Sequence, residues 1–553
     1  MSSSWNTPPG GARHHSASLL RKLLFSLLVG VLSVSVAWAG AGLVPVGDLA
    51  KDAAGKTDAT ASTLSSDPVS GDPASEGNQS PELVLQGGEV LAGASKISME
   101  PRPDDYGGTW EKDPAKCETF PPSDFSSGDH IASTGSPWNE NPDCIYMGGF
   151  GIGPANSVSS WDQTYGLWVR SFAVKGPNGK TLSLTILDGE GYLWDYNHKC
   201  TDCGLKQIAA SVASDPTLGL EKEGIVIAAT HSHSAPDFLG GWGFVPDWYM
   251  TQIKETIKQA ITEAVTSMQP AVLEVGEVTA REENHERRDT YRAAEEQNLT
   301  WLRAVSTHAP GNPEVIATIG TYAAHPTNNG TNGGKASSDW VGPFEKRVED
   351  RFGGVALYFM TGLGNMSSSG FWIGEALANL IPEVGGGTTL QNTNVSYAQT
   401  TWVHPATNVP LTALGVPGFF DRKFVNQPSH IEVGESETSP CVSASPVSVE
   451  MAATGARIGD QFALSAAPGE IFSSISNSIK ERSDALVTMP IAQANDALGY
   501  MPQSMEINPV GQQGLGFTDL TGSLFINYED SYAVDRCLGD AVQEKIIGML
   551  GSL

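Results

Sequence analysis

The stretch "IVIAATHSHSAPD" (225–237) runs from apolar residues straight into two histidines. A short β-rich run that ends in small and turn-forming residues is typical of a buried strand. His231 and His233 follow this run, one residue apart. Because side chains repeat every two residues on an extended backbone, we expect both imidazoles to lie on the same face. The HxH pattern fits a metal or acid–base site, but two solvated loop histidines give the same pattern.

The rest of the chain alternates between strand-like and helix-like segments. Runs rich in β-formers at 181–187, 224–229, 315–322, 355–360 and 461–466 are predicted strands. Residues 246–268, which begin at Pro246, are a predicted helix because apolar residues recur at helical spacing on one face. Those residues are Met250, Ile253, Ile257, Ala260, Ile261, Ala264 and Met268. The alternation predicts an α/β fold, which we expect to be a single large domain with a mostly buried mixed sheet.

Two segments before this domain differ from it in composition. Basic residues precede an apolar run at 23–36, and a small-x-small cleavage pattern ends at Ala39. We therefore predict a signal peptide at 1–39 and a secreted, extracellular protein, with an uncleaved membrane anchor as the alternative. Residues 40–100 contain no Phe, Trp, Tyr or Cys, so we expect a flexible low-complexity linker there. The predicted folded domain then spans 101–553.

Charge and cysteine usage narrow the classes of partner and compartment. The chain carries 33 Lys and Arg against 62 Asp and Glu, a net charge of −29. This charge disfavours nucleic acid and anionic membrane as partners. The six cysteines favour disulfides in an exported chain, although the pairing is open. The pair Cys200 and Cys203 fits a structural disulfide better than a zinc knuckle, because no second such pair exists.

Further polar residues follow other predicted strands. His325 comes after "VIATIGTYAA", Ser367 after "VALYFMTGLGNM" and Glu470 after "QFALSAAPG". Because α/β folds gather ligand-binding and catalytic groups at the ends of strands, we expect these side chains to share one site with the two histidines. The sequence contains neither HExxH nor G-x-S-x-G, the signatures of common metalloproteases and serine hydrolases.

These segments resemble motifs of the neutral, non-lysosomal ceramidases, of which the chain looks like a divergent member. "ATHSHSAPD" resembles GTHTHSGP, "TYAAHPT" resembles FAVHxT, and "SSDWVG" resembles SSDNKG. "TGLGNMSS", "AAPGEIF" and "ANDALGY" are similar to NxGDVSPN, VPGEF and NDYxGY. The segments keep the family's order and cover roughly residues 147–532, so the resemblance is to the catalytic domain.

The resemblance implies a zinc-dependent amidohydrolase of ceramide-like lipids, which releases a fatty acid and an amine. The implied zinc ligands are His231, His325, Glu470 and Tyr500. Such a ligand set would lower the pKa of a bound water and make a nucleophile at neutral pH. The resemblance also implies a lipid-like N-acyl amide as substrate and peripheral contact with a membrane to reach it.

Three more residues take roles from the resemblance. His233 is the implied acid–base group beside the metal. Ser367 is either a nucleophile or a group that positions water and substrate; we favour positioning because an activated water makes a second nucleophile unnecessary. Arg287 falls where the family has a substrate-binding arginine, but the surrounding match is poor, and a surface arginine fits this stretch better.

The chain also departs from the family pattern around the substrate. Ser-Ser-Gly follows Ser367 in place of Pro-Asn, and "HSAPDFLGGWG" replaces HSGPGG. After Leu553 there is no room for the family's immunoglobulin-like domain, so we expect none. A zinc hydrolase of another acyl or ester substrate, and a non-catalytic exported binding protein that retains the fold, are therefore alternatives.

Overall fold

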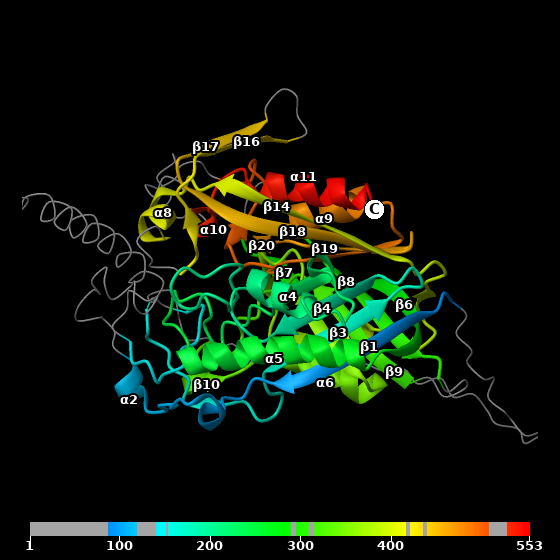
Figure 1. Ribbon diagram of the computed structural model, residues 1–553, viewed down its shortest axis with the longest axis horizontal. Coiled ribbons are helices and arrows are strands. Elements are labelled where there is room, and N and C mark those ends of the chain that lie inside the picture. The colour runs from blue at the N-terminus through cyan, green and yellow to red at the C-terminus, as the bar shows by residue number, and fades with distance from the viewer. Residues whose placement is uncertain are drawn as a thin grey trace, which may run out of the picture. The chain divides into compact units, whose positions relative to one another are not determined.

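Two mixed β-sheets lie face to face and carry helices on their outer faces (Figure 1). The structure is a computed structural model. It describes residues 87–118, 140–150, 153–288, 295–308, 314–415, 421–434, 440–507 and 528–553.

The larger sheet has nine strands in the order β11-β9-β8-β6-β1-β3-β4-β5, with β13 paired to β6. They are β1 (Val90–Ser98), β3 (Trp168–Lys175), β4 (Thr181–Leu187), β5 (Ile225–Ala229), β6 (Gln269–Thr279), β8 (Asn298–Ser306), β9 (Glu314–Tyr322), β11 (Val355–Met360) and β13 (Thr388–Thr389). The pairs β4–β5 and β9–β11 are parallel, whereas β1, β3, β6 and β8 pair antiparallel with their neighbours. All residues of β4 and β5 are buried, as expected for strands covered on both faces.

The smaller sheet has the order β14-β18-β19-β21, with β15 paired to β18. Its strands are β14 (Val395–Pro405), β15 (Phe424–Val425), β18 (Ser448–Ile458), β19 (Phe462–Ala466) and β21 (Val487–Ile491). One apolar core joins the facing sheets, with Phe172 and Phe359 from the larger sheet and Phe462 and Met489 from the smaller. This dry layer fixes the two sheets against each other.

Helices cover the outer faces of both sheets (Figure 1). Helices α5 (Asp247–Thr266) and α6 (Val341–Phe352) pack on the larger sheet, and α9 (Ser473–Arg482) and α11 (Leu538–Leu550) pack on the smaller. The remaining helices are η1 (Pro103–Tyr106), α2 (Pro114–Cys117), α4 (Leu205–Ala213), η2 (Lys222–Gly224), η3 (Asn332–Gly334), α7 (Ile373–Leu380), α8 (Val409–Gly415) and α10 (Tyr528–Tyr532). No helix within the described ranges is both long and apolar enough to cross a membrane.

Short strand pairs complete the structure. They are β2 (Ser160–Trp161) with β10 (Lys335–Ala336), β7 (Asn284–Glu286) with β12 (Met366–Ser368), β16 (Ser429–Val433) with β17 (Cys441–Ser445), and β20 (Glu470–Ile471) with β22 (Tyr500–Met501). Two of these pairs, β7–β12 and β20–β22, carry residues that the sequence selected as site candidates.

The predicted secondary structure agrees with the observed elements. The predicted strands match β4 and β11 and fall within one residue of β5, β9 and β19. The helix expected at 246–268 is α5, and Pro246 is its N-cap residue. The α/β fold with a mixed, mostly buried sheet is confirmed.

The expected linker at 40–100 extends too far. Strand β1 lies inside that range and pairs antiparallel with β3 and β6, so the fold begins before residue 101. The composition of 40–100 lacks aromatic residues, but β1 still contributes to the core between the sheets, where Val90 and Ala92 are buried. The predicted signal peptide at 1–39 lies outside the described residues.

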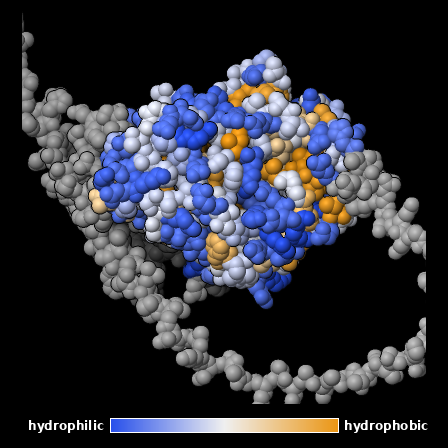
Figure 2. Space-filling model, turned by 90° about the horizontal axis from the view of Figure 1, so that it is seen from below, coloured by the Kyte–Doolittle hydropathy of each residue, from blue (hydrophilic) through white to orange (hydrophobic). Residues whose placement is uncertain are grey.

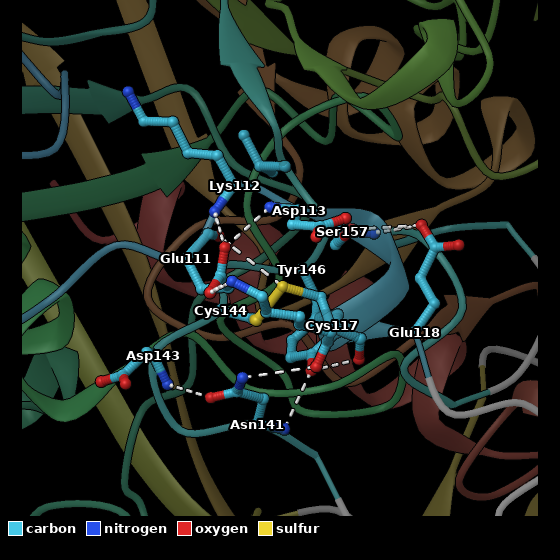
Figure 3. Close-up of a disulfide and its surroundings, with 12 residues drawn as sticks. Glu111, Lys112, Asp113, Cys117, Glu118, Asn141, Asp143, Cys144, Tyr146 and Ser157 are labelled. Atoms are coloured by element: carbon cyan, nitrogen blue, oxygen red, sulfur yellow. Dashed lines mark hydrogen bonds and ion pairs between the residues drawn. A yellow bond between two sulfur atoms is a disulfide. The ribbon is translucent and has the colours of Figure 1, made fainter.

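All six cysteines form disulfides. Cys200 pairs with Cys203, as predicted, and Cys441 pairs with Cys537. The third bond, Cys117–Cys144, fastens α2 to the segment before Tyr146, whose hydroxyl donates to Cys117 O at 2.8 Å (Figure 3). Three disulfides fit a protein of an oxidising compartment. One face of the molecule is hydrophilic over most of its area, in keeping with the charge of the chain (Figure 2).

Candidate metal centre

The candidate site forms where ends of strands from both sheets meet. Residues 492–495, which follow β21, lie between β5 and β11: Ala492 N donates to Met360 O at 2.8 Å, and Ala229 N donates to Gln493 O at 3.1 Å. Strands β5 and β11 are at opposite ends of the strand order, so this short segment connects the two ends of the larger sheet. The residues that follow β5, β9, β11 and β19 are thereby brought to one place.

Three imidazoles and one carboxylate converge there. Nitrogen atoms of His231, His233 and His325 all lie within 4.8 Å of one another. His231 Nε2 is 3.3 Å from His233 Nε2 and 3.4 Å from Glu470 Oε2, and His325 Nε2 is 3.1 Å from the same carboxylate oxygen. Zinc bonds of 2.0–2.1 Å in a tetrahedron place ligand atoms about 3.3 Å apart, so this donor set fits zinc in both chemistry and spacing.

A backbone carbonyl fixes the orientation of the His231 ring. Its Nδ1 lies 2.6 Å from Glu190 O, a hydrogen bond that directs Nε2 toward Glu470. Its backbone is left-handed, with φ at 58°, and so is that of Gln493, whose side chain lies 3.2 Å from His231 Nδ1. The extended backbone expected for the HxH stretch is therefore wrong at His231. The two imidazoles face each other because of a strained turn, a feature that clusters at functional sites.

His233 differs from the other two histidines in its access to solvent. It is partly exposed, whereas His231 and His325 are buried. Its Nδ1 donates to Gly149 O at 3.1 Å, which leaves the lone pair on Nε2, and the ring of Phe150 packs edge-on at 5.3 Å. Burial and the charges of His231 and His325 hold the pKa of His233 well below its usual range, so it is a neutral imidazole whose accepting nitrogen faces the site.

His325 and Ser367 come to the site as neighbours. His325 N and Nδ1 both donate to Met366 O, at 3.1 and 3.0 Å, and residues 325 and 367 form a β-bridge. Ser367 is partly buried and also pairs with His285 of β7. The backbone, rather than a side chain, therefore fixes Ser367 beside His325.

Tyr500 and Arg287 lie on the Glu470 side of the site. Glu470 and Tyr500 are direct partners in the β20–β22 pair. Arg287 Nη2 donates to Tyr500 Oη at 3.1 Å and to Gly364 O at 2.9 Å, while Nε contacts Glu529 Oε1 at 3.0 Å. Arg287 is thus a largely buried residue of the site, and the surface position that fitted the sequence better is wrong.

Burial and neighbouring charges set the ionisation of the candidate ligands. Burial would raise the pKa of Glu470, but His231 and His325 hold it well below its usual range. Burial and the charge of Arg287 lower the pKa of His325 to about 4. Burial opposes a positive His231, yet Glu470 and Glu190 raise its pKa to about 9. An ionised carboxylate with neutral imidazoles is the protonation state that metal ligands need, and a metal would displace the proton of His231.

Several residues of the site were missed in the sequence. Glu190 is buried, its Oε1 lies 4.0 Å from His231 Nδ1, and burial raises its pKa to about 8. Glu190 follows β4, a predicted strand, and the strand-end argument applies to its position, whereas Gln493 follows β21, which was not among the predicted strands. Phe150 and Gly149 lie in a segment without regular structure, and no periodic pattern marks them.

The chain is similar in fold to known ceramidase structures. Neither a protein-family model nor a curated protein sequence matches it. The crystal structure of neutral ceramidase from Pseudomonas aeruginosa matches with a TM-score of 0.55 and 14% identity, over 84% of this chain and 74% of that one. A ceramidase complexed with C2 matches with the same TM-score and identity, over 83% of this chain and 74% of that one. The chain therefore has a neutral ceramidase-like fold.

Proposed function

We propose that the chain is an exported zinc-dependent amidohydrolase, which cleaves the N-acyl amide of ceramide-like lipids into a fatty acid and an amine. The observation that carries this proposal is the meeting of His231, His233, His325 and Glu470 in a ceramidase-like fold. These residues come from three distant stretches of the sequence, and their donor atoms reach ligand spacing only because the segments after β5, β9 and β19 converge. The three disulfides support export.

The donor set assigns the residues that would hold the metal. His231, His325 and Glu470 are buried and point at one another, so they are the proposed ligands, and Tyr500 is the proposed fourth because it pairs with Glu470. When bound there, zinc supplies a Lewis acid that polarises a carbonyl oxygen and makes water more acidic. Arg287 holds the hydroxyl of Tyr500 through its hydrogen bond at 3.1 Å.

The remaining residues handle the proton and the substrate. His233 Nε2 takes a proton from the attacking water, whose oxygen bonds to the amide carbon. The same imidazole then gives that proton to the amide nitrogen as the carbon–nitrogen bond breaks, which yields the acid and the free amine. Ser367, fixed beside His325, positions the water or the amide, and Arg287 lines the substrate side of the site.

A substrate panel tests the proposal. The zinc-loaded protein is expected to release fatty acid from a labelled ceramide faster than from short N-acyl amides and from esters of the same acyl chain. His233→Ala is expected to retain zinc and to lower kcat by about 10²–10⁴-fold, the usual contribution of an acid–base group.

Each alternative outcome would contradict a different part of the proposal. Faster turnover of esters would make the chain a different zinc hydrolase, and no turnover of any substrate would make it a binding protein. Loss of zinc from His233→Ala would show that His233 is a ligand and not the acid–base group.

A further inference from the structure

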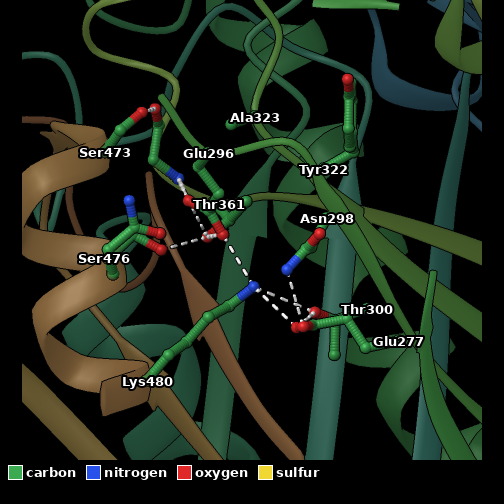
Figure 4. Close-up of polar contacts among 12 residues, drawn as sticks. Glu277, Glu296, Asn298, Thr300, Tyr322, Ala323, Thr361, Ser473, Ser476 and Lys480 are labelled. Carbon is green, nitrogen blue, oxygen red and sulfur yellow. Dashed lines mark hydrogen bonds and ion pairs between the residues drawn. The ribbon is translucent and has the colours of Figure 1, made fainter. Parts of the chain in front are cut away.

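A buried ion pair lies against the turn that leads to Ser367 (Figure 4). Glu296 is 2% exposed, and its Oε1 lies 2.9 Å from Lys480 Nζ. The ammonium of Lys480, on α9, also contacts Glu277 Oε2 and Thr300 Oγ1, each at 3.1 Å. The ammonium of Lys480 thus has three hydrogen-bonding partners, and it holds the carboxylate of Glu296 from one side.

The other side of the Glu296 carboxylate holds the turn at residues 361–365. Its Oε2 accepts from Gly362 N at 3.1 Å, and both of its oxygens lie 3.3 Å from Thr361 Oγ1. A Cβ added at Gly362 would lie 2.6 Å from Glu296 Oε2, so the turn is pressed directly onto the carboxylate. A hydrogen bond from a backbone amide to a buried carboxylate is among the stronger kinds.

The turn at residues 361–365 also contacts three parts of the candidate metal centre. Gly364 N donates to Ile471 O at 3.0 Å, immediately after Glu470. Gly364 O accepts from Arg287 at 2.9 Å. The chain then continues to Met366, whose carbonyl accepts from His325 Nδ1 at 3.0 Å. The turn is therefore the shared support of a histidine and a carboxylate that come from different sheets.

Helix α9 also forms hydrogen bonds with the turn at residues 361–365. Ser473, its first residue, donates from Oγ to Gly362 O at 3.0 Å, and its N–H donates to Asn365 Oδ1 at 2.9 Å. Because Lys480 lies on the same helix, the helix that follows Glu470 and the turn that precedes Ser367 are both tied to Glu296.

We propose that Glu296 is a positioning residue, which sets the distance between the proposed zinc ligands His325 and Glu470. This inference rests on the proposed function only in that the site binds zinc. Groups that orient metal ligands without touching the metal typically contribute 10–100-fold to metal affinity. Glu296 acts through the turn at residues 361–365 and through Ser473, and not through contact with substrate.

A second buried ion pair provides a matched control. Arg303 and Glu274 are both fully buried, their charged atoms lie 3.5 Å apart, and Glu274 also accepts from a loop glycine, Gly385 N, at 2.8 Å. This pair joins β6 and β8, and among the described residues none of its hydrogen bonds or ion pairs reaches the turn at 361–365 or the candidate ligands. Glu274→Gln and Glu296→Gln therefore remove the same charge from similar surroundings.

The test compares the zinc affinity of the two variants by competition with a chelator. Glu296→Gln is expected to weaken zinc binding at least about tenfold, whereas Glu274→Gln is expected to bind zinc like the unmodified chain. Thermal unfolding of both variants measures how much stability each substitution removes. A purely structural role of the two pairs would lower stability in both variants. Ser473→Ala, which removes one link between the turn and α9, is expected to weaken zinc binding in the same direction and replaces Glu296→Gln if that variant does not fold.

Zinc affinity that is unchanged in Glu296→Gln, or reduced equally in Glu274→Gln, would overturn the inference. Unchanged affinity in Ser473→Ala would overturn it if Glu296→Gln does not fold. The readout is independent of turnover. A chain that binds zinc but hydrolyses no amide would overturn the proposed function while the affinity comparison still decides the role of Glu296.

Discussion

At the scale of single residues, Gly149 sets the position of the proposed acid–base group. Its φ is 85°, and a Cβ at this position would lie 2.2 Å from His233 Nδ1. Its carbonyl also accepts the Nδ1 hydrogen bond that leaves Nε2 free. Glycine is therefore required here twice, for the left-handed backbone and for the close approach of the imidazole.

Gly149→Ala is predicted to push His233 out of place. Activity is expected to fall about 10²-fold, the size of loss that a misplacement of about 1 Å can cause, while zinc binding is retained. Gly179→Ala is the control, because Gly179 has a φ of 83° and nothing within 4 Å of an added Cβ. Both variants should lose about 1–2 kcal/mol of stability for the left-handed backbone. Equal activity in the two variants would contradict the role of His233.

The strand-end argument predicted which polar side chains lie near one another. His231, His325, Ser367 and Glu470 all come directly after β-rich runs, and the structure brings them together. It failed for the backbone of His231, because a left-handed residue is set by tertiary contacts and leaves no periodic signal. Glu190 was overlooked although it follows β4, since its role depends on burial that the sequence does not show.

At the scale of elements, the segment after β21 brings together the strand ends that carry the site. Its hydrogen bonds to β5 and β11 join the opposite ends of the larger sheet. The sequence predicted five of the strands individually, β4, β5, β9, β11 and β19, because each has a strong local pattern. Strand order and the insertion of residues 492–495 depend on contacts between distant segments, which local patterns do not encode.

A buried histidine–aspartate pair links other elements away from the site. His404 Nε2, on β14, lies 3.1 Å from Asp535 Oδ1, and Ser443 and Thr407 donate to the other oxygen. Burial raises the pKa of Asp535, but hydrogen bonds and charge from His404, with those two hydroxyls, bring it below its ordinary value. The ionised carboxylate therefore stabilises the folded state.

Stability is predicted to fall in acid through Asp535. A depressed carboxyl pKa contributes stability that is present above the unfolded pKa, about 3.9, and is lost as the pH falls through the folded value. Asp535→Asn should cost about 1–3 kcal/mol at neutral pH and should lose less than the unmodified chain on going to about pH 3.5. Urea unfolding at both pH values measures this. Asp105→Asn, at an exposed carboxyl of η1, should behave like the unmodified chain. Equal acid sensitivity of Asp535→Asn and the unmodified chain would show that this pair is not responsible.

At the scale of the whole molecule, a ceramidase-like fold is retained at 14% identity. Short motifs in the family's order were enough to predict it, because they mark the strand ends where the site is built. The pairing of the other four cysteines could not be predicted, since partners such as Cys441 and Cys537 are separated by 96 positions and only folding brings them together. The segments that depart from the family pattern lie around the substrate, so the substrate panel, and not the motifs, decides the substrate.

The measurement that tests the central claim most directly is the metal content of the purified protein, read together with its hydrolysis of a labelled ceramide. The unmodified chain is predicted to hold about one zinc per chain, and His325→Ala and Glu470→Gln to lose both the zinc and the activity. His198→Ala, at a partly exposed histidine outside the site, should keep both. Chelation should abolish hydrolysis, and added zinc should restore it. A metal-free chain that hydrolyses ceramide at an undiminished rate would contradict the account.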